Sequence, residues 1–92
     1  MTKYLIEVPH DSHRVACAIA VQIFLNSGNH FLANADWGCK DGEHKAWMIV
    51  EAANKAQARS ILPFGYQPQA KIVALNRFGM EEIEELLRDP GH

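Results

Sequence analysis

Three histidines in the first third of the chain have residue types and spacing that could form a metal site. His10 and His13 flank the predicted turn from a strand into a helix, and His30 follows that helix. Neutral imidazole is an ordinary ligand for nickel, zinc, copper and iron. The simpler alternative is that these are surface residues, because a helix N-terminus favours anions over cations.

Carboxylates are expected beside these histidines. The predicted topology brings four segment ends to one edge of the sheet. They are the end of the first strand, the start of the first helix, the start of the second strand and the end of the third strand. Asp11 and Glu51 would then approach His30 and the other two histidines. We therefore predict a divalent-metal site at His10, His13 and His30, with nickel or zinc as candidate ions. Alternatively, His30 only pairs with Glu51 across a hairpin.

A second polar group is predicted on the open face of the sheet, around Glu7 on the first strand. Its other members are Asn34, Asp36, Trp47 and Glu51. A carboxylate in an apolar pocket can act as a general base, so Glu7 is the candidate catalytic residue and the others are candidate ligand contacts. The alternative is that these groups satisfy one another at a dimer interface.

The two cysteines, Cys17 and Cys39, have no C-x-x-C spacing. No secretory signal is recognised, so both are expected to be free thiols in a cytoplasmic protein. Cys17 lies on an apolar helix, as a small core residue would. Cys39 lies in a turn beside Lys40 and near His44, where a cation would make the thiol reactive. No third group that would orient it is evident, which is typical of a bystander cysteine.

The elements that position the first histidines are a strand and a helix. Residues 3–8 are rich in β-formers, and Pro9 ends this strand because proline cannot donate to a sheet. A helix follows from His13 to Asn26, with Asp11 or Ser12 as its cap and a left-handed glycine, Gly28, after it. This helix is apolar nearly all round, so more than one surface should cover it.

A hairpin is predicted to follow. Residues 29–37 and 44–52 read as strands, and Asp41-Gly42 between them is a strong turn signal. A turn centred near Lys40 pairs Asp36 with Lys45 and turns Leu32 toward the open face.

The remainder of the chain contains a helix, a strand and a second helix. Asn54 and Gln57 form a capping-box pattern for a helix that Pro63 ends. Residues 70–78 read as the fourth strand, and a short acidic helix follows Gly79. Residues 89–92 read as a frayed tail.

This order predicts an α+β fold, a ferredoxin-like βαββαβ sandwich with a four-stranded antiparallel sheet and a short C-terminal helix, in one domain spanning 1–92. Strands one and three are central. With both helices on one face, apolar residues remain on the other, among them Leu5, Leu32, Trp47 and Ile49. Such a face favours a homodimer through the sheet, as in a dimeric α/β barrel. The alternative is a monomer whose terminal helix covers its own sheet.

The element order and the segments 30–39 and 47–51 resemble the dimeric α/β-barrel superfamily of ferredoxin-like proteins. That group includes muconolactone isomerase-like proteins, small cofactor-free monooxygenases and small nickel-binding proteins. The resemblance extends from Lys3 to Phe78 and is one of fold. It implies a homodimer and is compatible with metal binding or with small-molecule chemistry, without implying a particular set of catalytic residues.

Composition narrows the functional classes. The formal net charge of -2 offers no basic surface for nucleic acid, and no apolar run is long enough to cross a membrane. Glycine-rich nucleotide-binding motifs, G-x-S-x-G and H-E-x-x-H are absent from the sequence. We therefore predict a small dimeric protein that binds a small ligand or a divalent transition metal. The alternatives are a cofactor-free isomerase or monooxygenase-like enzyme and a structural subunit.

Overall fold

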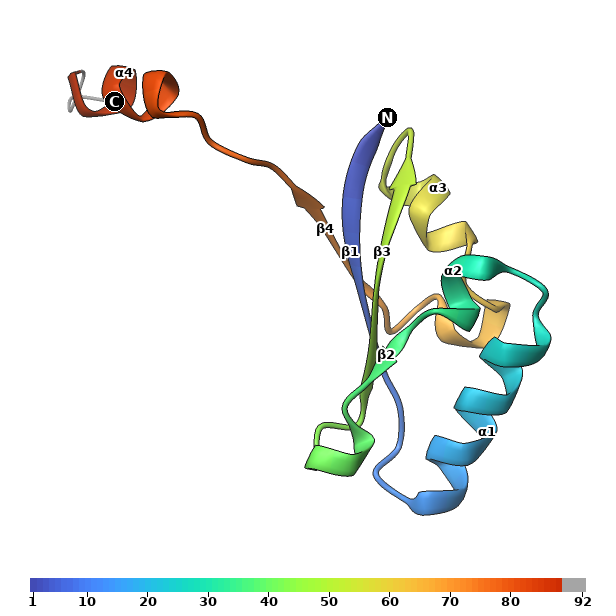
Figure 1. Ribbon diagram of the computed structural model, residues 1–92. Helices are drawn as coiled ribbons and strands as arrows, with labels where there is room; N and C mark the ends of the chain where they lie inside the picture. Colours follow the sequence, from blue (N-terminus) through green and yellow to red (C-terminus); the bar gives the residue numbers. More distant parts are fainter. Residues whose placement is uncertain (89–92) are drawn as a thin grey trace.

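A four-stranded antiparallel sheet forms the centre of the molecule (Figure 1). The computed structural model describes residues 1–88. The strands are β1 (Thr2–Pro9), β2 (Asp36–Trp37), β3 (Lys45–Ala52) and β4 (Lys71–Leu75), in the order β2-β3-β1-β4. The predicted α+β class and the central places of β1 and β3 are confirmed.

Helices cover one side of this sheet (Figure 1). They are α1 (Arg14–Asn26), α2 (His30–Ala33) and α3 (Lys55–Ser60), with 3-10 turns η1 (Cys39–Asp41) and η2 (Phe64–Tyr66). A fourth helix, α4 (Met80–Arg88), stands clear of the sheet. Within residues 1–88, no helix is both long and apolar enough to cross a bilayer.

The core lies between the sheet and the helices. Alternate residues of β1 and β3 point into it, because successive strand side chains face opposite sides. The buried residues include Tyr4, Ile6 and Val8 of β1, Ala46, Met48 and Val50 of β3, Phe24 of α1 and Leu32 of α2. The intervening strand residues form the open face, where Ile49 is 54% exposed.

The predicted second strand is largely wrong. The chain forms α2 at His30–Ala33, and only Asp36 and Trp37 remain as strand. The Asn29 side chain caps α2 by accepting a hydrogen bond from the Phe31 amide, at 2.8 Å. Leu32 is consequently buried in the core and does not lie on the open face. The ferredoxin-like arrangement is thus realised only in part.

The hairpin register also differs from the prediction. Asp36 pairs with Trp47, and Trp37 pairs with Ala46, a displacement of two residues. The 3-10 turn η1 lengthens the loop, and Gly42 closes it with a left-handed φ of 83°. A displacement of two residues leaves every strand side chain on its predicted face, which is why Trp47 still lies on the open face.

Two helix caps had clear sequence signals, and one of them is confirmed. The Asn54 side chain accepts from the Gln57 amide, and Gln57 in turn accepts from the Ala53 amide. For α1, by contrast, the N-cap is His13 without a side-chain hydrogen bond, so the predicted Asp11 or Ser12 cap is wrong. Gly28 does take the left-handed conformation after this helix, with φ of 78°.

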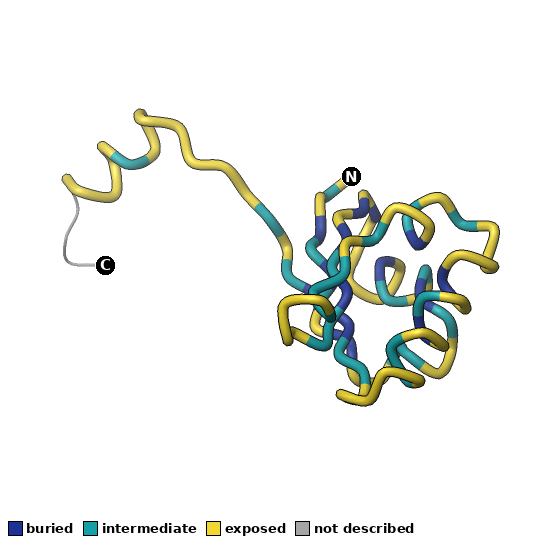
Figure 2. Tube along the Cα trace, turned by 60° about the horizontal axis from the view of Figure 1, so that its bottom comes forward, coloured by how far each residue is buried: buried dark blue, intermediate teal, exposed yellow. Residues whose placement is uncertain are grey.

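The segment that follows β4 and carries α4, here called the α4 arm, projects away from the rest of the molecule, so the overall shape is elongated (Figure 2). The radius of gyration is 16.6 Å, against about 12 Å for a compact chain of this length. No residue of α4 is buried. The helix therefore presents its apolar stripe of Met80, Ile83 and Leu87 without a covering surface in the described chain.

Candidate metal centre

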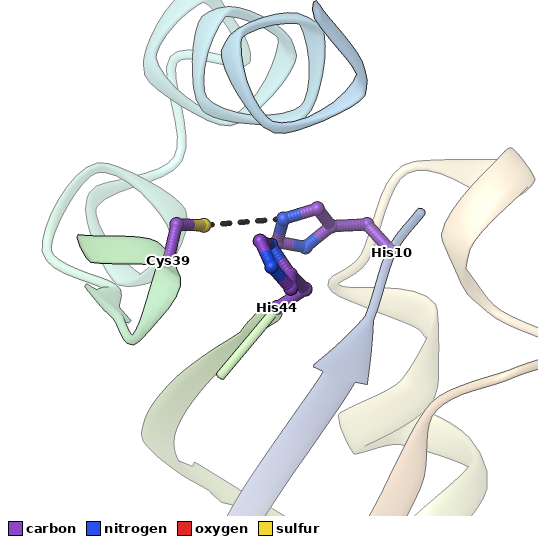
Figure 3. Close-up of side chains that lie close together, drawn as sticks. All are labelled: His10, Cys39 and His44. Atoms are coloured by element: carbon purple, nitrogen blue, oxygen red, sulfur yellow. Dashed lines mark hydrogen bonds between the residues drawn. The ribbon is translucent and has the colours of Figure 1, made fainter. Parts of the chain in front are cut away.

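His10, Cys39 and His44 gather beneath α1 at one end of the sheet (Figure 3). One ligand atom from each residue lies within 4.8 Å of the other two. The Cys39 Sγ is 3.2 Å from His10 Nε2. The two imidazole rings stand edge to face with centroids 5.9 Å apart. Three groups that commonly ligate transition metals thus face one small volume.

The strand pairing explains why the two histidines meet. His10 directly follows β1, and His44 directly precedes β3. Since these strands are antiparallel and Pro9 pairs with Lys45, the end of one strand lies beside the start of the other. The His10 amide donates to the His44 carbonyl at 3.0 Å, which ties the two backbones together.

The η1 turn brings Cys39 to the histidines. The Gly38 amide donates to the Lys45 carbonyl, and the Glu43 amide donates back to the Gly38 carbonyl. These bonds close the loop from Gly38 to His44 over the end of the sheet. Trp37 packs its ring against both Phe24 and His10, with centroid distances of 5.0 and 5.7 Å. The core thereby fixes the base of the site.

Burial leaves nitrogen atoms of both histidines without partners. His10 and His44 are half-buried, and the Nδ1 atom of each is buried with no hydrogen bond. A buried polar atom without a partner is destabilising unless something binds it. Burial lowers the pKa of His10, the positive charge of His44 lowers it further, and Asp11 opposes both effects. A lowered pKa favours the neutral form of His10, which is the form that metals bind.

A disulfide joins Cys17 of α1 to Cys39, with 7.0 Å between their Cα atoms. The expectation of two free thiols is therefore wrong for this structure. The sequence placed Cys17 on a helix and Cys39 in a turn, and nothing in their spacing indicated contact. The packing of α1 over the end of the hairpin brings the two sulfur atoms together.

Of the histidines predicted to bind metal, the structure brings only His10 into this cluster. His13 is exposed at the start of α1, and His30 is exposed on α2 with its ring against Phe31. Glu51 pairs with Lys3 at the opposite end of β1. We predicted that the end of β3 lies beside the end of β1. Because the two strands are antiparallel, the start of β3 lies beside the end of β1 instead.

His44 is not among the predicted metal ligands, because the sequence shows it only as a neighbour of Cys39. A signal for it was present. Two histidines at the facing ends of adjacent antiparallel strands must lie close together once the pairing is known. His10 follows the end of β1 and His44 precedes the start of β3, so they are such a pair.

Of the residues predicted to surround Glu7, the structure brings some close to it and places others elsewhere. Glu7 Oε1 accepts a hydrogen bond from Trp47 Nε1 at 3.1 Å and lies 3.8 Å from Lys45 Nζ. Asp36 pairs with Trp47 in the sheet. Asn34 instead caps α2, where its side chain donates to the His30 carbonyl, and Glu51 is at the far end of β3. The catalytic role of Glu7 and the ligand contacts stay predictions.

An open depression of about 530 Å³ adjoins the cluster on the α1 side. His10 lines it together with Asp11, Ala16 and Tyr66. It offers a route by which a small ion could reach the imidazole from solvent. The chain matches no family model, and no curated protein or solved structure matches it either. The case for its function thus rests on the geometry of the site.

Proposed function

We propose that this protein binds a divalent transition metal at His10, Cys39 and His44. The observation that carries the proposal is the convergence of two imidazoles and one sulfur atom within 4.8 Å, with buried Nδ1 atoms that lack partners. Coordination would use Nε2 of His10, the nitrogen that faces Cys39, together with a ring nitrogen of His44. The proposal keeps the metal-binding function expected from the sequence and changes two of the predicted ligands.

The donor types indicate which metals fit. Nitrogen and sulfur donors favour zinc, nickel and copper, whereas magnesium and calcium prefer oxygen. Donor atoms around a tetrahedral zinc ion lie roughly 3.3–3.8 Å apart, given its usual bond lengths. The Cys39–His10 distance of 3.2 Å is close to that range. A modest rotation of side chains would bring the whole group, now within 4.8 Å, to the coordination distance.

Calorimetry tests this proposal directly. Protein reduced with a dithiol would be titrated with Zn²⁺ and Ni²⁺, beside the variants His44→Ala and His30→Ala. We expect one metal ion per chain in the parent and in His30→Ala. His44→Ala should lose at least about tenfold in affinity, because it removes a ligand.

The control variant separates this site from the one first predicted. His30 is exposed and outside the cluster, so its removal should not change binding. Equal affinities in the parent and His44→Ala would contradict the proposal. Loss of binding in His30→Ala alone would instead favour the histidine set predicted from the sequence.

We also propose that the protein is a homodimer in solution, with α4 of one copy against the open sheet face of the other. Support comes from the apolar stripe on α4 and from exposed Ile49 on the open face. The resemblance to dimeric α/β barrels also implies a homodimer through this face, but one in which sheet packs against sheet. Sedimentation velocity would report the mass.

A further inference from the structure

We propose that Cys17 is a fourth ligand of this metal centre, and that the bound metal and the Cys17–Cys39 disulfide exclude each other. The inference rests on the proposed metal-binding function and extends it to a new residue and to redox control. In the oxidised protein, Cys39 is held in the disulfide. In the reduced protein, two thiolates and two imidazoles would be available, a common ligand set for zinc.

The position of Cys17 supports this assignment. Its sulfur is bonded to Cys39 Sγ, which itself lies 3.2 Å from His10 Nε2. Cys17 Sγ is therefore one bond away from an atom of the three-residue cluster, although it is not itself within 4.8 Å of every donor in that cluster. It approaches from α1, on a different element from the other donors. Four donors from four separate segments can surround an ion, as tetrahedral coordination requires.

The backbone around the cysteines is well placed for either state. The Cα atoms of Cys17 and Cys39 are 7.0 Å apart, slightly more than the roughly 4.4–6.8 Å that is usual for a disulfide. Two thiolates on one tetrahedral zinc ion have their sulfur atoms about 3.8 Å apart, farther than in a disulfide. A wide Cα separation therefore suits the metal-bound form without a large movement of α1.

The conversion between the states is a two-electron reaction. A dithiol reductant gives two electrons and two protons to the sulfur–sulfur bond, which breaks to leave one thiol on Cys17 and one on Cys39, while the reductant becomes a disulfide. A divalent metal then displaces both thiol protons and binds two thiolates. Both cysteines are half-buried residues.

Cobalt is a suitable probe, because Co²⁺ occupies zinc sites and its thiolate bonds absorb in the near ultraviolet. Oxidised and dithiol-reduced protein would each be titrated with Co²⁺, and thiol alkylation would be counted before and after metal addition. We expect binding only after reduction, with a strong thiolate band and both cysteines protected from alkylation. Metal-loaded protein should also resist reoxidation to the disulfide.

The variant Cys17→Ser isolates the role of the new ligand. It cannot form the disulfide and should bind Co²⁺ whether or not reductant is present, at least about tenfold more weakly than the reduced parent and with about half the thiolate band. Ala18→Ser is the matched control, since Ala18 is an exposed neighbour on α1. It should behave like the parent in both redox states.

The outcomes distinguish this inference from the proposed function. If reduced Cys17→Ser binds Co²⁺ as tightly as the parent with an equal thiolate band, Cys17 is not a ligand and the inference fails, while the three-residue site stands. Equal binding by oxidised and reduced parent would overturn the mutual exclusion. Absence of binding in every state would overturn the proposed function, and this inference with it.

Discussion

At the scale of residues, the site depends on side chains that the core holds in place. His10 is bounded by Trp37 on one side and His44 on another. Its contact with Cys39 comes from a residue 29 positions away in sequence. The imidazoles are preorganised by strand pairing, so a metal ion would not need to order a flexible loop before binding. Glu7, unlike the Nδ1 atoms of the two histidines, has hydrogen-bonding and charged partners within the fold, namely Trp47 and Lys45.

Replacing Glu7 with Gln should have little effect on stability. The amide oxygen can still accept from Trp47 Nε1, and the lost ion pair with Lys45 is partly exposed. Such pairs contribute less than about 1 kcal/mol. Chemical denaturation of both proteins would measure the difference. A loss above about 2 kcal/mol would show that the charge itself stabilises the open face.

At the scale of elements, the β2–β3 loop decides whether Cys39 reaches the histidines. Gly38 lies where the chain crosses closely over Trp47 and Glu43. A Cβ atom there would lie 2.7 Å from the Glu43 carbonyl oxygen and 2.8 Å from the Trp47 ring. Backbone lies on one side, and on the other lies the Trp47 ring, which its hydrogen bond to Glu7 holds in place, so there is little room to adjust. Glycine is needed at this position for its small size.

Gly38→Ala should therefore destabilise the fold by about 1–3 kcal/mol, the usual cost of overpacking. It should also weaken metal binding by the reduced protein, because the loop that carries Cys39 must shift. Thermal denaturation and metal titration would measure both effects.

The matched control for this variant is Gly65→Ala. A Cβ atom at Gly65 meets nothing within 4 Å, so stability should change by no more than about 0.5 kcal/mol. Unchanged metal affinity in Gly38→Ala, despite a loss of stability, would show that the loop is not required to position Cys39.

At the scale of the whole molecule, the separate α4 arm is the main departure from a compact domain. A chain of 92 residues has a small core, and the exposed apolar stripe of α4 places further apolar surface in water. Association with a second copy would remove this surface from water. The candidate metal centre and the open sheet face are on different parts of the fold, so the proposed assembly and the proposed metal binding can be tested independently.

Leu87→Glu should dissociate the proposed dimer, because it places a carboxylate in the apolar stripe of α4. Gln69→Glu adds the same charge at an exposed site away from α4 and serves as the control. Sedimentation velocity should give the mass of one chain for the first variant and of two chains for the second. A parent protein that sediments as a monomer would contradict the proposed assembly.

Local patterns in the sequence determined much of the fold. Alternating apolar residues specified β1 and β3, Pro9 and Gly28 marked element ends, and the Asn54–Gln57 pattern specified the start of α3. These signals act within a few residues, so they can be read without knowing what lies nearby. They were weaker at residues 29–37, where β-like composition was overridden by the cap at Asn29 and by the burial of Leu32 in the core.

Only the tertiary structure decided which residues make up the candidate metal centre. The sequence by itself identified His10 as a candidate ligand and Cys39 as a candidate reactive group, but it joined His10 to His13 and His30. Antiparallel pairing selected His44 as its neighbour, and the packing of α1 selected Cys17 as the partner of Cys39. Both selections depend on contacts between residues more than twenty positions apart, and such contacts leave no local pattern in the chain.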